Sequence, residues 1–110
     1  MKHDLQALRA GLTARLDELR AMSAGSKNDR KPVELDQTSV GRLSRVDSLQ
    51  GQAMAMAQEK RRYDEIKRIE AAIQRVDDGE YGFCLKCGEP IDAARLAVDA
   101  TIPTCIACAR

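Results

Sequence analysis

Two Cys-x-x-Cys pairs constrain this chain more than any other feature of its 110 residues. Cys84 and Cys87 form the first pair, Cys105 and Cys108 form the second, and 17 residues separate the pairs. Two residues between paired cysteines let both sulfurs reach one ion, and a loop of this length can bring two pairs together as a tetrahedron. The pattern predicts one structural zinc ion held by all four thiolates, with no coordination position left for a substrate.

The same cysteines are also compatible with unmetallated thiols, a disulfide pair or a zinc-thiolate redox sensor, because Cys-x-x-Cys motifs lower the pKa of a thiol. The start of the chain, Met1-Lys2-His3-Asp4, is not followed by an apolar signal core, and no apolar run is long enough to span a membrane. These observations predict a cytoplasmic protein. Because cysteines stay reduced in the cytoplasm, this compartment favours the metal site.

Residues 79–110 contain few large apolar side chains for an independent core. These are Tyr81, Phe83, Leu85, Ile91, Leu96, Val98, Ile102 and Ile106. Metal binding is therefore expected to contribute about 10 kcal/mol or more to the folding of this segment.

The first part of the chain has the pattern of an amphipathic helix over residues 2–22. Apolar side chains recur there every three or four residues, at Leu5, Leu8, Leu12, Leu16, Leu19 and Met22. Residues 23–32 are small and polar and end in a proline, which predicts a connector that continues to residue 37, with Asp36 as a candidate N-cap.

Residues 38–78 contain no proline and predict a second, longer helix, which Gly79 ends in a left-handed conformation. The apolar positions expected to form its stripe are Val46, Leu49, Ala53, Met56, Tyr63, Ile66, Ile69, Ile73 and Val76. Met54 and Met56 are expected to pack inside the protein. Because the second helix is about twice as long as the first, its final turns, Ile66 to Val76, are expected to need another cover. The finger that follows is expected to provide it.

The predicted fold class is mainly α: an antiparallel two-helix coiled-coil hairpin over residues 1–78, followed by a four-cysteine zinc finger over residues 79–110. Only 3% of the residues are aromatic and 32% are charged, which suits long solvated helices better than a broad globular core. The polar end of such a hairpin, residues 23–47, has a shape that can reach into a cleft.

Charge and missing motifs narrow the possible functions. The chain has 18 Lys and Arg residues and 17 Asp and Glu residues, which disfavours nucleic acid as the main partner because that affinity comes largely from phosphate neutralisation. The sequence has no nucleophile elbow, phosphate loop or histidine pair, and its single histidine, His3, is expected to be solvated. An enzyme is not expected.

The densest basic stretch is Lys60-Arg61-Arg62 with Lys67-Arg68. Acidic residues interleave with it at helical spacings, which predicts a solvated face laced with ion pairs. A patch that contacts a phosphate backbone or an acidic protein surface is the alternative.

The C-terminal third resembles the DksA/TraR family of bacterial transcription regulators. The resemblance is carried by Asp78-Gly79-Glu80-Tyr81-Gly82-Phe83-Cys84-Leu85-Lys86-Cys87-Gly88-Glu89-Pro90-Ile91, by Arg95-Leu96, and by Pro103-Thr104-Cys105-Ile106-Ala107-Cys108. It implies a protein that binds RNA polymerase through the secondary channel, in some members together with ppGpp, and that does not bind specific DNA sequences. The protein is expected to be a monomer. The acidic Asp-x-x-Asp-x-Ala motif of the best-known members is absent, and the charged candidates near the tip are Asp36, Arg42, Arg45 and Asp47.

Two other functions remain open at this stage. The hairpin and finger are compatible with a zinc-stabilised interaction module for a different partner, which the missing acidic motif favours. The finger is also compatible with weak nucleic-acid binding through Lys86, Arg95 and Arg110, which the near-neutral charge disfavours.

Overall fold

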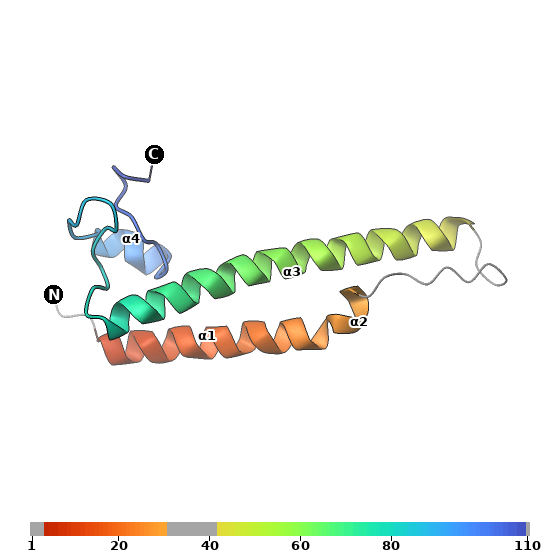
Figure 1. Cartoon of the computed structure of the whole chain (residues 1–110), viewed down its shortest axis with the longest axis horizontal. Coiled ribbons are helices and arrows are strands. Elements are labelled where there is room, and N and C mark those ends of the chain that lie inside the picture. Colours follow the sequence, from red (N-terminus) through yellow and green to blue (C-terminus); the bar gives the residue numbers. More distant parts are fainter. Residues whose placement is uncertain (1–3, 31–41, 110) are drawn as a thin grey trace.

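The computed structural model of the chain describes residues 4–30 and 42–109, and it shows a long helical hairpin with a small module at one end (Figure 1). Helix α1 (Leu5–Gly25) and the short helix α2 (Lys27–Arg30) lie along helix α3 (Arg42–Asp77). Helix α4 (Ala93–Val98) belongs to the module that follows α3. The mainly helical fold class predicted from the sequence is confirmed.

Side chains and backbone groups define the helix ends next to the module. Asp4 caps α1, because its side chain accepts a hydrogen bond from the amide of Ala7 at 3.1 Å. At the end of α3, the amide of Glu80 donates to the carbonyl of Arg75, and Gly79 adopts a φ of 74°. This is a Schellman motif, and it confirms the left-handed glycine that the sequence predicts.

The helix boundaries differ from the sequence-based ones on the side away from the module. Helix α1 continues to Gly25, and α2 occupies residues that were predicted to belong to the connector. The Ser23 hydroxyl donates to Glu59 of α3, and the Ser26 hydroxyl donates to the carbonyl of Ser23. Because these polar side chains have partners, the helix continues past Met22 despite the polar sequence. Asp36, predicted as an N-cap, lies outside the described residues.

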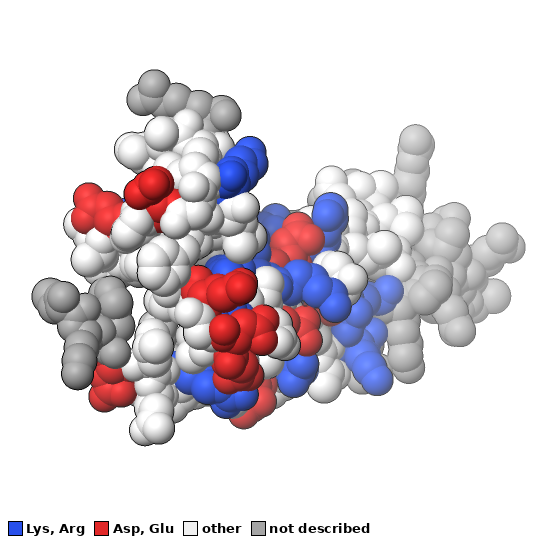
Figure 2. Space-filling view, turned by 60° about the vertical axis from the view of Figure 1, so that its left-hand side comes forward, with Lys and Arg blue, Asp and Glu red and all other residues white. Residues whose placement is uncertain are grey.

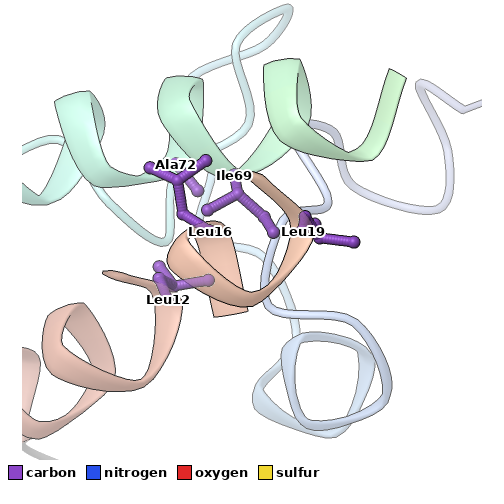
Figure 3. Packing of buried hydrophobic residues seen from close by; sticks show 5 residues of the cluster. All are labelled: Leu12, Leu16, Leu19, Ile69 and Ala72. Atoms are coloured by element: carbon purple, nitrogen blue, oxygen red, sulfur yellow. The ribbon is translucent and has the colours of Figure 1, made fainter. Parts of the chain in front are cut away.

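The core of the hairpin lies between α1 and the last third of α3 (Figure 3). Its buried members are Leu12, Leu16, Leu19, Ile69 and Ala72. Leu19 and Ile69 are only 1% and 2% exposed, and the small Ala72 lets the two helices approach closely.

Ion pairs connect the two helices along their contact. They are Arg9–Asp77 at 2.7 Å, Arg15–Glu65 at 2.9 Å and Arg20–Glu70 at 3.1 Å. Each pair is solvent-exposed, so the pairs add little to the stability of the hairpin.

The predicted apolar stripe of the second helix is wrong in its first half. Val46, Leu49, Met56 and Tyr63 are all exposed, whereas Ile69 is buried. At about 100° per residue, the positions from Val46 to Met56 lie about 140–220° around the helix from Ile69, on the opposite side. The spacings of three and four residues used for the prediction average less than about 3.6, so the predicted positions drift around the helix from one face to the other.

The finger covers the last turns of α3 only in part: Val76 packs on its core as expected, but the preceding turns have another cover. Helix α1 packs on Ile66, Ile69 and Ile73 directly, because the start of α1 and the end of α3 both lie beside the module (Figure 1). The module adds Ala100 to the same cluster. The part of α3 that extends beyond its described helical partners is its beginning.

A cluster of polar side chains joins the elbow between α1 and α2 to α3. The Glu59 carboxylate accepts hydrogen bonds from the Ser23 hydroxyl at 2.9 Å and from Arg62 at 3.0 Å. Arg62 also donates to the Ser26 hydroxyl at 2.9 Å, and Arg30 lies 3.7 Å from Glu59. These side chains are mostly shielded from solvent, so the polar cluster takes the place of apolar packing at this level of the hairpin.

Burial opposes ionisation of Glu59, but the hydrogen bonds from Ser23 and Arg62, with the charges of Arg30 and Arg62, outweigh it and lower its pKa. A pKa that is lowered in the folded state stabilises the protein above the usual value of 4.5, and this contribution is lost as the pH falls below that value. The cluster should therefore loosen in acid.

We expect Glu59→Gln to lower the free energy of unfolding by about 1–2 kcal/mol at pH 7, because hydrogen bonds to a charged carboxylate are replaced by bonds to a neutral amide. The difference between the two proteins should shrink as the pH falls below about 4, where the carboxylate protonates. Urea unfolding across this pH range measures it, with Asp64→Asn in the exposed Lys60–Asp64 pair as the control. An equal loss in both variants would contradict a special role for Glu59.

Candidate metal centre

The four cysteines come together at one point of the module. Their sulfur atoms all lie within 4.8 Å of one another, and the sulfurs of Cys87 and Cys105 are 3.7 Å apart. A zinc–sulfur distance of about 2.3 Å in a tetrahedron corresponds to a separation of about 3.8 Å between sulfurs. The donor set and its spacing therefore fit a tetrahedral zinc ion bound by four thiolates.

Backbone turns position the first pair of cysteines. The amide of Cys84 donates to the carbonyl of Glu89 at 2.8 Å, and the amide of Gly88 returns to the carbonyl of Cys84 at 2.9 Å. Gly88 has a φ of 76°, a conformation that favours glycine, so the chain can reverse immediately after Cys87. The amide of Lys86 points at the sulfur of Cys84 at 3.4 Å.

The thiols have very different acidities in this arrangement. The backbone amide of Cys105, with those of Cys87 and Lys86, outweighs burial and lowers the pKa of Cys84 to about 6. Contacts with the thiols of Cys105, Cys84 and Cys87 raise the pKa of Cys108 to about 12. Four thiolates this close repel one another, so the site needs a divalent cation to stabilise all of them in the ionised form.

The module has a small core of its own. Its buried members are Tyr81, Cys84, Ile91 and Leu96. Cys105 and Cys108 are partly buried against this cluster, so both cysteines of the second pair are also packing residues. The metal centre and the module's core therefore depend on each other.

Polar contacts hold the loop of the module that meets the hairpin, one within the module and one from α3. The Tyr81 hydroxyl donates to the carbonyl of Ala100 at 2.8 Å, and the buried Arg75 donates to the carbonyl of Thr101 at 3.3 Å. Leu8 and Val76 pack against the module's core. Sequence inspection did not find these contacts, because their partners are backbone carbonyls whose position depends on the folded loop.

The other charged candidates lie in different places. Asp36 and Arg110 are outside the described residues, and Arg42 and Arg45 fall in the first turns of α3. Asp47 is exposed on the same helix. Arg95, considered above for nucleic acid, instead donates to the carbonyl of Thr104 at 3.2 Å and supports the loop before Cys105.

Helical position would have revealed the polar cluster at Glu59. Counting back from the buried face at Ile69 and Ile66 in steps of three and four leads to Arg62 and Glu59. Charged residues at helical positions that face the partner helix indicate such a polar cluster. The sequence-based stripe was assigned to the wrong face, so these two positions were not recognised.

Comparison with known proteins agrees with the geometry. Residues 79–110 match the model of the prokaryotic dksA/traR C4-type zinc finger. RNA polymerase-binding transcription factor DksA from Caulobacter vibrioides is 40% identical over 52 residues, which are 47% of this chain and 37% of that protein. The protein of the same name from Escherichia coli K12 is 40% identical over 43 residues, 39% of this chain and 28% of that protein. The matched segments thus span less than two fifths of these relatives.

A solved structure extends the likeness to the hairpin. Transcription factor DksA2 from Pseudomonas aeruginosa superposes with a TM-score of 0.74 and covers 96% of this chain and 79% of its own. The sequence identity is 22%, so this comparison establishes the fold.

Fold and site together define a four-cysteine zinc-finger protein built on a helical hairpin. Residues 79–110 carry the C4-type zinc finger of the dksA/traR type, and the chain shares the fold of DksA2. Its named relatives are transcription factors and not enzymes. Among the described residues, no helix has the length and apolar character needed to cross a membrane.

Proposed function

We propose that this protein is a transcription factor that binds RNA polymerase, and that one structural zinc ion held by Cys84, Cys87, Cys105 and Cys108 stabilises its finger. The observation that carries the proposal is the finger itself, which matches the dksA/traR model and relatives named for RNA polymerase binding. The fold shared with DksA2 over 96% of the chain supports the same role for the hairpin.

The hairpin is the element that contacts polymerase in this proposal. The beginning of α3 extends beyond the described parts of α1 and α2 and is the part expected to enter the secondary channel, with Asp36, Arg42, Arg45 and Asp47 as candidate contacts. The protein acts as a monomer in the cytoplasm, by protein contact and without recognition of a DNA sequence, and ppGpp bound to polymerase is a candidate co-regulator. Near-neutral total charge supports a protein partner over nucleic acid.

Competition for purified bacterial RNA polymerase against a known secondary-channel ligand tests this function. The zinc-loaded protein is expected to displace the ligand, and Asp36→Ala or Asp47→Ala is expected to weaken its effect on promoter output at least threefold without changing its thermal stability, because Asp47 is exposed. The exposed Asp17→Ala on α1 is the control. Absence of binding at tens of micromolar would favour an interaction module with a different partner.

A further inference from the structure

The beginning of α3 carries an exposed surface without charge. Residues 48–58 contain no Asp, Glu, Lys or Arg, whereas nine of the following twelve residues are charged. These eleven residues form about three helical turns, about 16 Å in length. In a chain with 32% charged residues, a solvated helix this long without charge calls for an explanation.

Large apolar side chains gather on one side of these turns and of the residues just before them. Val46, Leu49 and Met56 are 44%, 47% and 55% exposed, and Met54 is 65% exposed. Ala53 and Ala57 lie between them and are also exposed. We call Val46, Leu49, Ala53, Met54, Met56 and Ala57 the outer face. The partly buried Gln52 and Ala55 lie on the side of the helix that continues toward Glu59 and the rest of the hairpin.

The expectation that Met54 and Met56 pack inside the protein is therefore wrong for the described chain. Helix α2 ends at Arg30, whose carbonyl accepts a hydrogen bond from Gln52 at 3.5 Å. Helix α2 therefore contacts this part of α3 on the side away from the outer face. Methionine is flexible and polarisable and is common on surfaces that adapt to a protein partner.

Charged surface surrounds the rest of the hairpin. Acidic and basic side chains alternate over the end of the hairpin near the finger in Figure 2. Ion pairs such as Arg15–Glu65 and Lys67–Glu70 account for much of this surface. The outer face thus differs from the remaining hairpin in its chemistry and not only in its position.

We propose that the outer face is the docking surface for an uncharged, apolar wall of a protein partner, and that RNA polymerase is this partner, which rests on the function proposed above. The absence of charge over three turns gives no group that could neutralise a phosphate, so nucleic acid is disfavoured. The opposite side of the same turns is also uncharged, which is not the pattern of a basic helix at a membrane surface.

Area disfavours a second copy of the chain. Two such faces pressed together would bury on the order of 600 Å², about half of what the smallest stable protein interfaces bury. A concave partner can enclose a single projecting helix on several sides and bury more of it. The partner's surface should also lack charge, because the outer face has no charged group to pair with a charge that the partner would bury on binding.

The test is the double substitution Leu49→Gln and Met56→Gln in the full chain. Both side chains are exposed and glutamine is a good helix former, so zinc content and the midpoint of thermal unfolding should not change. We expect the dissociation constant for purified RNA polymerase to rise at least tenfold. Leu49→Met with Met56→Leu should retain wild-type affinity, because it keeps the apolar surface.

Val98→Gln with Ile106→Gln is the matched control, because these finger residues are even more exposed, at 87% and 67%. A larger loss in this control than in the Leu49/Met56 variant would overturn the assignment to the outer face. Equal binding of wild type and the Leu49/Met56 variant would overturn the docking surface and leave the proposed function intact. No polymerase binding by the wild type would overturn both.

Two further measurements separate other occupants. Flotation with phosphatidylglycerol vesicles that retains the wild type and releases the Leu49/Met56 variant would overturn the proposal in favour of a lipid surface. Sedimentation that shows a wild-type dimer lost in the variant would overturn it in favour of a second copy. A monomer that does not bind the vesicles is the expected result.

Discussion

Cys105→Ser is expected to abolish zinc binding and to unfold the finger. The sulfur of Cys105 lies 3.7 Å from that of Cys87, and removing one thiolate leaves three ligands and an incomplete tetrahedron. Because structural zinc contributes about 10 kcal/mol or more to small modules, the finger's core of Tyr81, Ile91 and Leu96 should not persist without it.

Three measurements check this prediction. Metal analysis should give one zinc per wild-type chain and none for the variant, and proteolysis should cleave residues 79–109 rapidly only in the variant. Circular dichroism should retain much of its helical signal, since α1 and α3 pack through Leu16 and Ile69 independently of the metal. Ala107→Ser places the same hydroxyl at an exposed position between Cys105 and Cys108 and should keep its zinc. A protease-resistant finger in metal-free Cys105→Ser would refute a structural role for zinc.

Loss of the finger should also weaken the hairpin at the end where the two meet. Ala100 packs against the hairpin core, and the buried Arg75 donates to the carbonyl of Thr101. A disordered loop would leave the Arg75 guanidinium without this acceptor. Faster amide exchange near Arg75 in the metal-free protein is therefore expected, with little change near Glu59.

Leu19→Ala is expected to lower the free energy of unfolding of the hairpin by about 2–5 kcal/mol. Leu19 is 1% exposed and packs with Leu16 and Ile69, so the truncation leaves a cavity in a core with few members. A two-helix hairpin has little other apolar burial to compensate, so the variant should be partly unfolded at 37 °C.

The control for this prediction is the same substitution at Leu49, which is 47% exposed. Leu49→Ala should change stability by about 0.5 kcal/mol or less, because an exposed leucine in the described structure fills no core. Thermal and urea unfolding measure both variants. Similar losses at Leu19 and Leu49 would show that the first half of α3 is packed in solution, and would contradict the register described above.

The sequence by itself determined the features that depend on local spacing. Cys84, Cys87, Cys105 and Cys108 were found as a group because a metal tetrahedron requires specific residue types at specific separations, and their sulfurs do converge. The helices followed from apolar periodicity, and Gly79 marked the end of α3 because only glycine adopts a positive φ there without strain.

Only the tertiary structure decided which face of the long helix is buried. Val46, Leu49 and Met56 follow a helical spacing as regularly as Ile66, Ile69 and Ile73, but the two groups point to different sides. Periodicity specifies a face relative to its own helix, whereas burial depends on where the partner helix ends and in which register it pairs. The pairing of Arg9 with Asp77 and of Ser23 with Glu59 reveals that register, because contacts between residues this distant along the chain exist only after folding.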